Sequence, residues 1–323
     1  MRAALVLPFV ALTFLCWGMY GPLLHHGRDG MGHNSLVQFI CVGLAYFAIA
    51  VVVPLAWLKT KGEPGRWTIN GTIWSVIAGI VGAVGALGVI FALTSGGSPV
   101  YVMPLVFGLA PVVNTVVSML MSRTLRDAGK IFMAGVILVA VGAAGVMYFK
   151  PLSSGVVSIW KLQVGQAMTV LASIAVTALC WGAYGPVLHK GQMKMSGSRL
   201  RPFLCVGLAY FGVAVLVPIA VLAARNEVVE WSFSGLTWSF AAGAAGAIGA
   251  LGVILAFNFG GRPIFVMPLV FGGAPVVNTL DFMVEHSAWD QMPLMFYVSL
   301  VAVIAGAVLV LVFAPRAHPA PAK

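Results

Sequence analysis

The sequence predicts an all-α integral membrane protein with ten transmembrane helices, arranged as two five-helix repeats of inverted topology. Three observations predict this fold: the composition, ten apolar stretches and an internal repeat. Hydrophobic residues make up 61% of the chain and charged residues 8%, whereas an average soluble domain has roughly 25% charged residues. A water-facing surface needs more charged residues than this chain has. We therefore expect most of its exterior to face lipid.

Ten apolar stretches are each long enough to cross the roughly 30 Å of hydrocarbon in a bilayer. Each is expected to be helical, because lipid offers no hydrogen-bond partner to an unpaired backbone group. Arg2 and the apolar run after it are typical of a secretory signal peptide. However, the Cys-Trp-Gly-x-Tyr-Gly-Pro motif at 16–22 recurs at 180–186, in the middle of the chain. We therefore expect the first helix to be retained. The stretches span 3–24, 36–57, 72–94, 99–121, 131–149, 167–189, 203–224, 236–258, 263–284 and 294–314.

A shift of 164 positions superimposes the two halves of the sequence without a gap. Cys41–Phe47 reappears as Cys205–Phe211, and about 57 of the 100 positions from 16 to 115 are identical to their counterparts. Such identity indicates a duplicated unit. The predicted organisation is a first repeat (1–149), a linker (150–166), an inverted second repeat (167–315) and a cytoplasmic tail (316–323).

The basic residues predict how the repeats are oriented. A unit of five crossings followed by a short linker must begin its second copy on the other side of the membrane. Lys59, Lys61 and Arg66 follow the second stretch, whereas the matching connection has Arg225 with two acids. With both termini in the cytoplasm, about 14 of the 18 Lys and Arg residues lie inside, as the positive-inside rule requires. We therefore expect both termini to be cytoplasmic. The sequence carries no organelle address, so the default expectation is a bacterial cytoplasmic (plasma) membrane.

Composition and motifs also argue against other classes of protein. The net charge of +10 comes from short basic clusters between apolar runs, which indicates membrane topology rather than nucleic-acid binding. Paired membrane-embedded acids and His-Glu-x-x-His motifs are missing from the sequence, so an enzyme, a cofactor and a metal site are not expected. The cysteines lie singly in apolar runs and predict packing rather than zinc or disulfides: Cys16, Cys41, Cys180 and Cys205.

Matched helix breaks are the first candidates for a substrate site, because inverted repeats place that site near the midplane at interrupted helices. A proline leaves the carbonyl one turn back without its helical donor, and that carbonyl can then face a polar solute. The alternative is that the prolines only bend the helices. The predicted breaks are Pro22, Pro104, Pro111, Pro186, Pro268 and Pro275.

Aromatic and amide side chains near these prolines are the substrate-binding candidates. Aromatic rings give a sugar or a heterocycle a flat apolar face and a tyrosine hydroxyl adds a polar contact, although an interfacial aromatic belt is the alternative. The asparagines share a helix face with the phenylalanines and bond either the substrate or a neighbouring helix. The candidates are Trp17, Tyr20, Phe107, Asn114, Trp181, Tyr184, Phe271 and Asn278, with Tyr46 and Tyr210 as further candidates of the same kind.

Three ionisable residues are candidates for ion coupling. His25 and His189 end the first and sixth stretches, and an imidazole can exchange a proton near neutral pH. The alternative is that both lie wet at the interface. Asp281 is expected to face a cavity, because an acid facing lipid is costly.

The glycines of the third and eighth stretches recur every three residues and predict a stripe for close helix packing. They are Gly79, Gly82, Gly85, Gly88, Gly243, Gly246, Gly249 and Gly252.

These features together resemble the drug/metabolite transporter superfamily with its EamA-type ten-helix fold, over essentially the whole chain. Trp17-Gly18 in the first helix, glycine-rich third helices and proline-containing fourth helices carry the resemblance. Tyr20-Gly-Pro22 and Tyr184-Gly-Pro186, with Pro54 and Pro218, are similar to the rhamnose and glucose/ribose porters. The resemblance implies a central cavity lined by helices 1, 3 and 4 and their counterparts. The first helix lacks the glutamate that small multidrug exporters use, so drug–proton antiport is not expected.

The function expected from the sequence is secondary, ATP-independent transport of a small polar metabolite, such as a sugar, by alternating access. The alternatives are a lipid flippase and a structural membrane-interaction protein. The expected partners are the small-molecule substrate and the lipid bilayer, with a homodimer as an open option and no nucleic acid.

Overall fold

A computed structural model describes residues 2–32, 34–97, 99–124, 128–149, 162–227, 229, 231–285, 292–313 and 315. Every regular element in these ranges is helical. Residues 150–161 of the predicted linker and the whole predicted tail, 316–323, lie outside the described residues. We call residues 2–149 the first half and residues 162–315 the second half.

The described part of each half forms five helical rods, one of which has a π-helical turn in its middle. The first half has α1 (Arg2–Asp29), α2 (Ser35–Tyr46) continued through the π-helical Phe47–Val52 into α3 (Val53–Thr60), α4 (Ile69–Thr94), α5 (Pro99–Ser122) and α6 (Lys130–Tyr148). The second half has α7 (Val164–Lys194), α8 (Leu200–Phe211) continued through the π-helical Gly212–Leu216 into α9 (Val217–Arg225), α10 (Phe233–Asn258), α11 (Pro263–Glu285) and α12 (Leu294–Phe313).

Length and hydropathy confirm the prediction of an all-α membrane protein. Within the described ranges, eight helices are long and apolar enough to cross a membrane. The described apolar stretches of α6 and α12, Lys130–Val146 and Leu294–Val310, are shorter. The count of ten crossings therefore stays a prediction.

Side-chain caps at matching positions explain where several helices begin. Thr68 accepts a hydrogen bond from the backbone N–H of Gly71 at the start of α4, and Ser232 does the same for Gly235 at the start of α10, each at 3.0 Å. Asn34 accepts from the backbone of Leu36 at 3.0 Å and so caps α2. Each cap satisfies a backbone donor that the first turn of a helix leaves unpaired.

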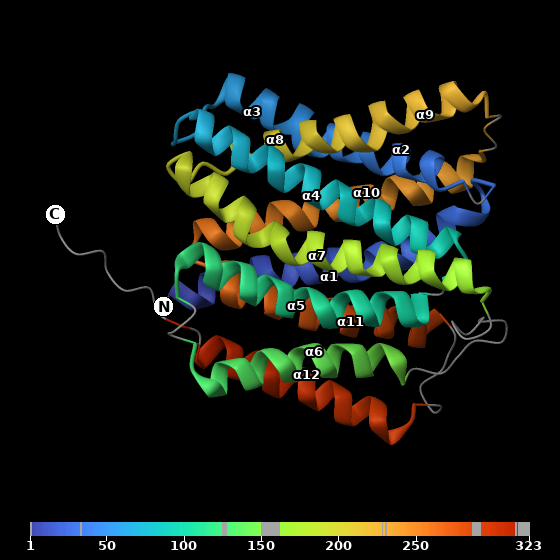
Figure 1. Cartoon of the computed structure of the whole chain (residues 1–323). Coiled ribbons are helices and arrows are strands. Elements are labelled where there is room, and N and C mark those ends of the chain that lie inside the picture. The colour runs from blue at the N-terminus through green and yellow to red at the C-terminus, as the bar shows by residue number, and fades with distance from the viewer. Residues whose placement is uncertain are drawn as a thin grey trace.

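The helices lie side by side as long, roughly parallel rods (Figure 1). The α6–α12 pair lies at one edge of the bundle and α3 and α9 at the other, with α1, α4, α5, α7, α10 and α11 between them. The chain enters α1 at the end of the bundle marked N, whereas α7 begins at the opposite end. The main contacts between the halves join α4 to α7, α1 to α10 and α6 to α12.

Many contacts between the halves occur twice. When each residue of such a contact is replaced by its counterpart 164 positions away, the result is the second contact. The Thr13 hydroxyl donates to the Gly249 carbonyl at 3.1 Å, and the Thr177 hydroxyl donates to the Gly85 carbonyl at 3.1 Å. Two aromatic residues of the first half each pack on their own counterpart. Tyr46 stacks on Tyr210 with ring centroids 3.6 Å apart, and Phe47 lies 4.7 Å from Phe211.

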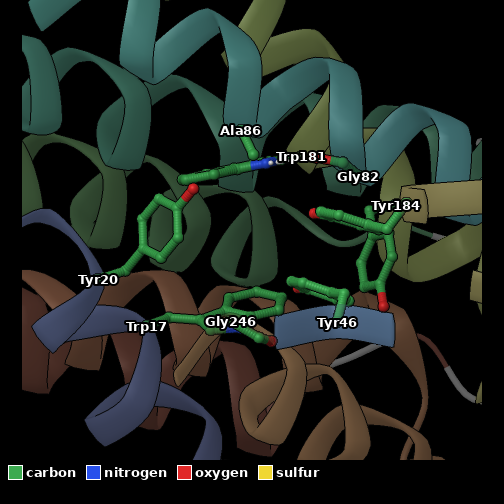
Figure 2. Close-up of a pocket in the computed structure, with 9 residues that line it drawn as sticks. Trp17, Tyr20, Tyr46, Gly82, Ala86, Trp181, Tyr184 and Gly246 are labelled. Atoms are coloured by element: carbon green, nitrogen blue, oxygen red, sulfur yellow. Dashed lines mark hydrogen bonds between the residues drawn. The ribbon is translucent and has the colours of Figure 1, made fainter. Parts of the chain in front are cut away.

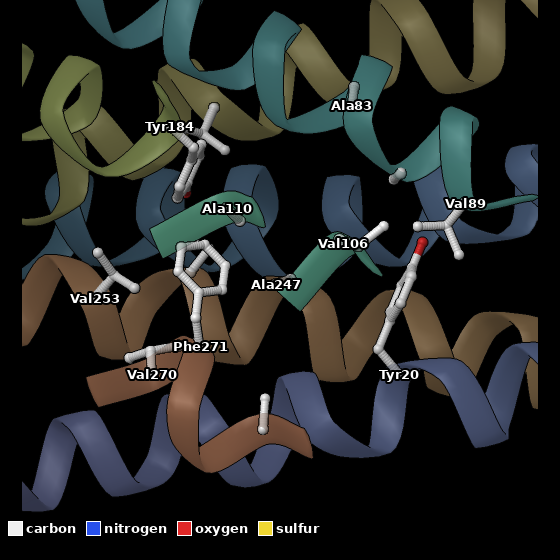
Figure 3. Close-up of a cluster of buried hydrophobic side chains, with 14 of the residues drawn as sticks. Tyr20, Ala83, Val89, Val106, Ala110, Tyr184, Ala247, Val253, Val270 and Phe271 are labelled. Carbon is white, nitrogen blue, oxygen red and sulfur yellow. The ribbon is translucent and has the colours of Figure 1, made fainter. Parts of the chain in front are cut away.

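The largest buried cluster draws on both halves at this interface. Figure 3 shows Val106 and Ala110 of α5 beside Val270 and Phe271 of α11, between the helices of both halves. Phe107 and Phe271 are fully buried, and their ring centroids are 6.2 Å apart. The apolar core is thus shared by the halves rather than divided between them.

The predicted helix breaks differ from the structure, because the helices continue through these prolines. α1 passes through Pro22, α7 through Pro186, and α11 through Pro268 and Pro275. α5 is likewise continuous from Pro99 to Ser122 across Pro104 and Pro111, although the Pro104 side chain lies outside the described part. A proline removes one donor, and neighbouring helices can satisfy the carbonyl it leaves unpaired, so the helix need not be interrupted.

The irregular backbone lies instead at the π-helical turns before Pro54 and Pro218. A proline at these positions cannot donate to the carbonyl four residues back, which favours a wider turn. Each π-helical turn packs closely against a helix of the other half. A Cβ on Gly43 of α2 would lie 2.8 Å from Ala214 in the second turn, and a Cβ on Gly207 of α8 would lie 2.8 Å from Ala50 in the first turn.

Candidate functional site

A small cavity lies at the interface between the halves. Its volume is about 30 Å³, enough for a water molecule or two. It is lined by α1, α2 and α4 from the first half and by α7, α8 and α10 from the second. The lining residues are Trp17, Tyr20, Tyr46, Gly82, Ala86, Trp181, Tyr184, Tyr210 and Gly246.

Aromatic rings from both halves form the walls of this cavity (Figure 2). Trp17 packs edge-on against Tyr184 with ring centroids 6.1 Å apart, and Tyr20 packs in the same way against Trp181 at 6.0 Å. In Figure 2 the Tyr20 hydroxyl points towards Trp181. The structure therefore brings together the four aromatic residues that the sequence singled out on α1 and α7.

Backbone carbonyls hold the tryptophan rings in place. The Trp17 Nε1–H donates to the Gly246 carbonyl at 3.2 Å, and the Trp181 Nε1–H donates to the Gly82 carbonyl at 3.3 Å. Both indole donors are thereby used within the protein. The tryptophans offer a solute their ring surfaces rather than a hydrogen bond.

Glycines on α4 and α10 make room for these rings, a role that the sequence alone does not indicate. A Cβ on Gly82 would lie 3.1 Å from the Tyr210 ring, and one on Gly246 would lie 3.0 Å from the Tyr46 ring. A Cβ on Gly85 would overlap the Trp181 indole. The predicted close helix packing is found at Gly79, whose Cβ would lie 2.8 Å from Val206 Cα. The stripe therefore serves both packing and the cavity.

Two buried tyrosine hydroxyls face the cavity region without a hydrogen-bond partner. Tyr20 and Tyr184 are each 4% exposed, and neither hydroxyl has a partner among the described residues. A buried polar group left without a hydrogen bond costs about 1–3 kcal/mol. A water molecule or a polar solute in the cavity would recover this free energy.

The predicted phenylalanines and asparagines do not line the cavity. Phe107 lies 6.4 Å from the Trp181 ring and Phe271 lies 6.3 Å from the Trp17 ring, so they support the cavity walls from behind. Asn114 donates to the Pro263 carbonyl at 3.0 Å. Asn278 donates to the Gly18 carbonyl at 3.4 Å, which is the carbonyl one turn before Pro22. Both amides therefore join helices in this structure.

The predicted coupling residues also lie away from the cavity. His25 is exposed and Asp281 is half-buried. His189 is half-buried, packs against Phe257 with ring centroids 4.9 Å apart and lines a different pocket. Within the described ranges, no group of three or more His, Cys, Asp or Glu side chains could hold a metal ion.

Comparisons with known proteins give a fold relationship. Neither the models of protein families nor the curated proteins give a match to this chain. Among the solved structures that match, one is described only as the crystal structure of a protein and has a TM-score of 0.66 at 15% sequence identity. The match covers 98% of this chain and 100% of the other. At this identity the similarity extends to the fold.

Proposed function

We propose that this protein is a secondary transporter that carries a small, neutral, polar metabolite across a membrane through the central cavity. The observation that carries the proposal is the position of that cavity. It lies between the two halves, has aromatic walls from both, and contains two tyrosine hydroxyls that have no hydrogen-bond partner among the described residues. A site between two repeats is where inverted-repeat transporters bind their substrates.

The proposal includes ten crossings in two inverted repeats of the drug/metabolite transporter type. The paired contacts 164 residues apart support it, as do the opposite starting ends of α1 and α7 (Figure 1). We further propose a bacterial cytoplasmic membrane, with both termini in the cytoplasm. Because the halves are so alike, the inward-open and outward-open states are expected to be close in energy, so a bound solute can shift their populations.

The lining of the cavity suggests the class of substrate. Its residues are aromatic or small, and none of them carries a charge. Aromatic rings suit the apolar face of a sugar or a heterocycle, and the Tyr20 and Tyr184 hydroxyls can bond its polar groups. At about 30 Å³ the cavity is too small for such a molecule, so this conformation is occluded and the walls must separate to admit the substrate.

Transport in proteoliposomes tests this proposal, with a panel of radiolabelled sugars and other neutral polar metabolites. The informative variant is Tyr20→Phe, which removes one hydroxyl and keeps the ring. For a transported compound, we expect Tyr20→Phe to lower kcat/KM by about tenfold, the equivalent of one hydrogen bond of about 1.4 kcal/mol. Tyr148→Phe is the matched control, because Tyr148 is 68% exposed and should transport normally.

Two results would count against the proposal. One is no transport of any compound in the panel by the folded wild-type protein. The other is a transported compound whose kcat/KM is the same in Tyr20→Phe and in Tyr184→Phe as in the wild type. A lipid-scrambling assay on the same vesicles separates the flippase alternative. Its basic headgroup site would include Arg199 and Arg201, but both already form ion pairs with Glu63.

A further inference from the structure

A second and larger pocket opens where the C-terminal ends of α5 and α7 meet the N-terminus of α11. Its volume is about 300 Å³, ten times that of the central cavity. We call it the basic pocket and define it by its five polar lining residues. These are Ser118, Ser122, His189, Lys190 and Arg262.

The charge in the basic pocket has one sign. Lys190 and Arg262 are cationic at neutral pH, and none of the described residues that line the pocket is a carboxylate. Lys190 Nζ lies 3.8 Å from the centroid of the Trp74 ring, a cation–π contact that keeps the ammonium group in place without neutralising it. Arg262 Nη1 donates to the Pro315 carbonyl at 2.8 Å, which uses one of its five N–H donors.

Two buried polar atoms at the basic pocket have no hydrogen-bond partner among the described residues. They are the Ser118 hydroxyl, on a residue that is 8% exposed, and Nδ1 of His189. A hydroxyl in this position can donate to an oxyanion, and such a bond recovers the cost of its burial. The N-terminus of α11 adds a partial positive charge on the same side.

The opposite end of the bundle carries the counterparts of these residues and differs from them in charge. His26 takes the place of Lys190, and Glu285 takes the place of Met121, which also lines the basic pocket. His26 Nε2 lies 3.7 Å from Glu285 Oε1. Among the described residues, the basic pocket therefore has positive charge without a carboxylate, whereas its counterpart region pairs a histidine with a glutamate.

We propose that the basic pocket binds a phosphate group. The donors come from α5, α7 and the connection before α11, and they outnumber the two oxygens of a carboxylate, so phosphate with its larger set of acceptor oxygens suits them better. The group is carried either by a soluble metabolite or by the head of an anionic lipid. Binding here needs no transport, so the inference goes beyond the proposed function.

The test measures binding to the full-length protein in dodecyl maltoside, which contains no phosphate. Inorganic phosphate is titrated at constant ionic strength against chloride, with the melting temperature and calorimetry as readouts. We expect phosphate, unlike chloride, to raise the melting temperature and to bind with a measurable Kd. Lys190→Gln, Arg262→Gln and Ser118→Ala should each weaken the binding, the two charge changes by about tenfold.

Lys194→Gln is the matched control, because Lys194 lies one turn further along α7, is exposed and does not line the pocket. It should bind phosphate like the wild type. A second titration with dihexanoyl phosphatidylglycerol identifies the source: tighter binding than inorganic phosphate indicates a lipid headgroup, and weaker binding indicates a soluble phosphate. The proposal is overturned if neither ligand binds better than chloride, or if the pocket variants, folded by their melting curves, bind as the wild type does.

Discussion

Glycine residues fix the positions of the two tryptophan rings at the cavity. The carbonyls of Gly82 and Gly246 accept the indole N–H bonds of Trp181 and Trp17. One turn further along each helix, Gly85 and Gly249 leave the space that the same indoles fill. The shape of the cavity therefore depends on pairs of glycines as much as on the aromatic rings.

Replacing Gly85 by alanine tests this dependence. The added Cβ would overlap Trp181, so the ring must move away from the Gly82 carbonyl. We expect a loss of about 1–3 kcal/mol in stability, as for other overpacked cores, and a shift in tryptophan fluorescence. Gly165→Ala is the control, since a Cβ there meets nothing within 4 Å, and it should unfold like the wild type. Equal melting temperatures for the two variants would contradict this role.

The sequence identified the aromatic residues of the cavity but not all of their partners. Trp17, Tyr20, Trp181 and Tyr184 stood out because a repeated Gly-Pro motif follows each pair. Gly82 looked like any other member of a packing stripe, because nothing local specifies that an indole from another helix will contact it. For Asn278 the sequence left two partners open, and in this structure its amide bonds the Gly18 carbonyl.

At the scale of elements, the connection between α3 and α4 is tied to the start of α8 by Glu63. Its carboxylate accepts from the Ser198 hydroxyl at 2.7 Å and from the backbone N–H groups of Arg199 at 2.8 Å and Leu200 at 3.1 Å. The Glu63 side chain is 4% exposed. A carboxylate at a helix N-terminus is favourable because it satisfies unpaired donors and opposes the helix dipole.

Stability at acidic pH should depend on Glu63. Burial alone would raise the pKa of this carboxyl, but the hydrogen bonds from Ser198, Arg199 and Leu200 outweigh it, so the pKa lies below its usual value. A lowered folded-state pKa means that the stabilisation is present above the unfolded pKa of about 4.3 and is lost as the pH falls through the folded value. Glu63→Gln should cost about 1–3 kcal/mol at neutral pH and flatten this acid dependence.

The second half provides the matched control for this prediction. Glu227 is the counterpart of Glu63 and accepts from Asn34 Nδ2 at 2.9 Å, but this contact is exposed. Glu227→Gln should therefore change stability by no more than about 0.5 kcal/mol. Unfolding curves of both variants in detergent between pH 3 and pH 7 provide the measurement. The same acid dependence in Glu63→Gln as in the wild type would refute the assignment.

The sequence predicted where the helices lie better than it predicted where their backbone becomes irregular. Each predicted stretch overlaps a helix in the part of the chain that the structure describes, because a span of apolar residues in lipid has to be helical. The π-helical turns were missed, although Pro54 and Pro218 were visible signals. Whether a proline interrupts, bends or widens a helix depends on which neighbour satisfies the unpaired carbonyl, and that neighbour is not local in sequence.

At the scale of the whole molecule, the self-similarity of the sequence is most visible where the halves meet. Tyr46 stacks on Tyr210 and Phe47 packs on Phe211, so residues 164 apart touch each other directly. Contacts of this kind are expected at a twofold axis relating the halves. The sequence revealed the repeat but not the contacts, because self-similarity does not specify which faces of the two copies pack together.

The proposed inverted arrangement, with both termini in the cytoplasm, makes a definite prediction about sidedness. Figure 1 places the ends of α3 and α7 at one end of the bundle and the end of α9 at the other. Lys61, Lys194 and Arg225 follow or end these helices and are exposed. With the four native cysteines replaced by alanine, Lys61→Cys and Lys194→Cys should react with a membrane-impermeant maleimide only after the cells are opened. Arg225→Cys should react in intact cells, because an inverted second copy exposes the matching connection on the outer side. Labelling of Lys61→Cys and Arg225→Cys from the same side would exclude the inverted arrangement, since these two connections are counterparts in the repeat and only inversion separates them.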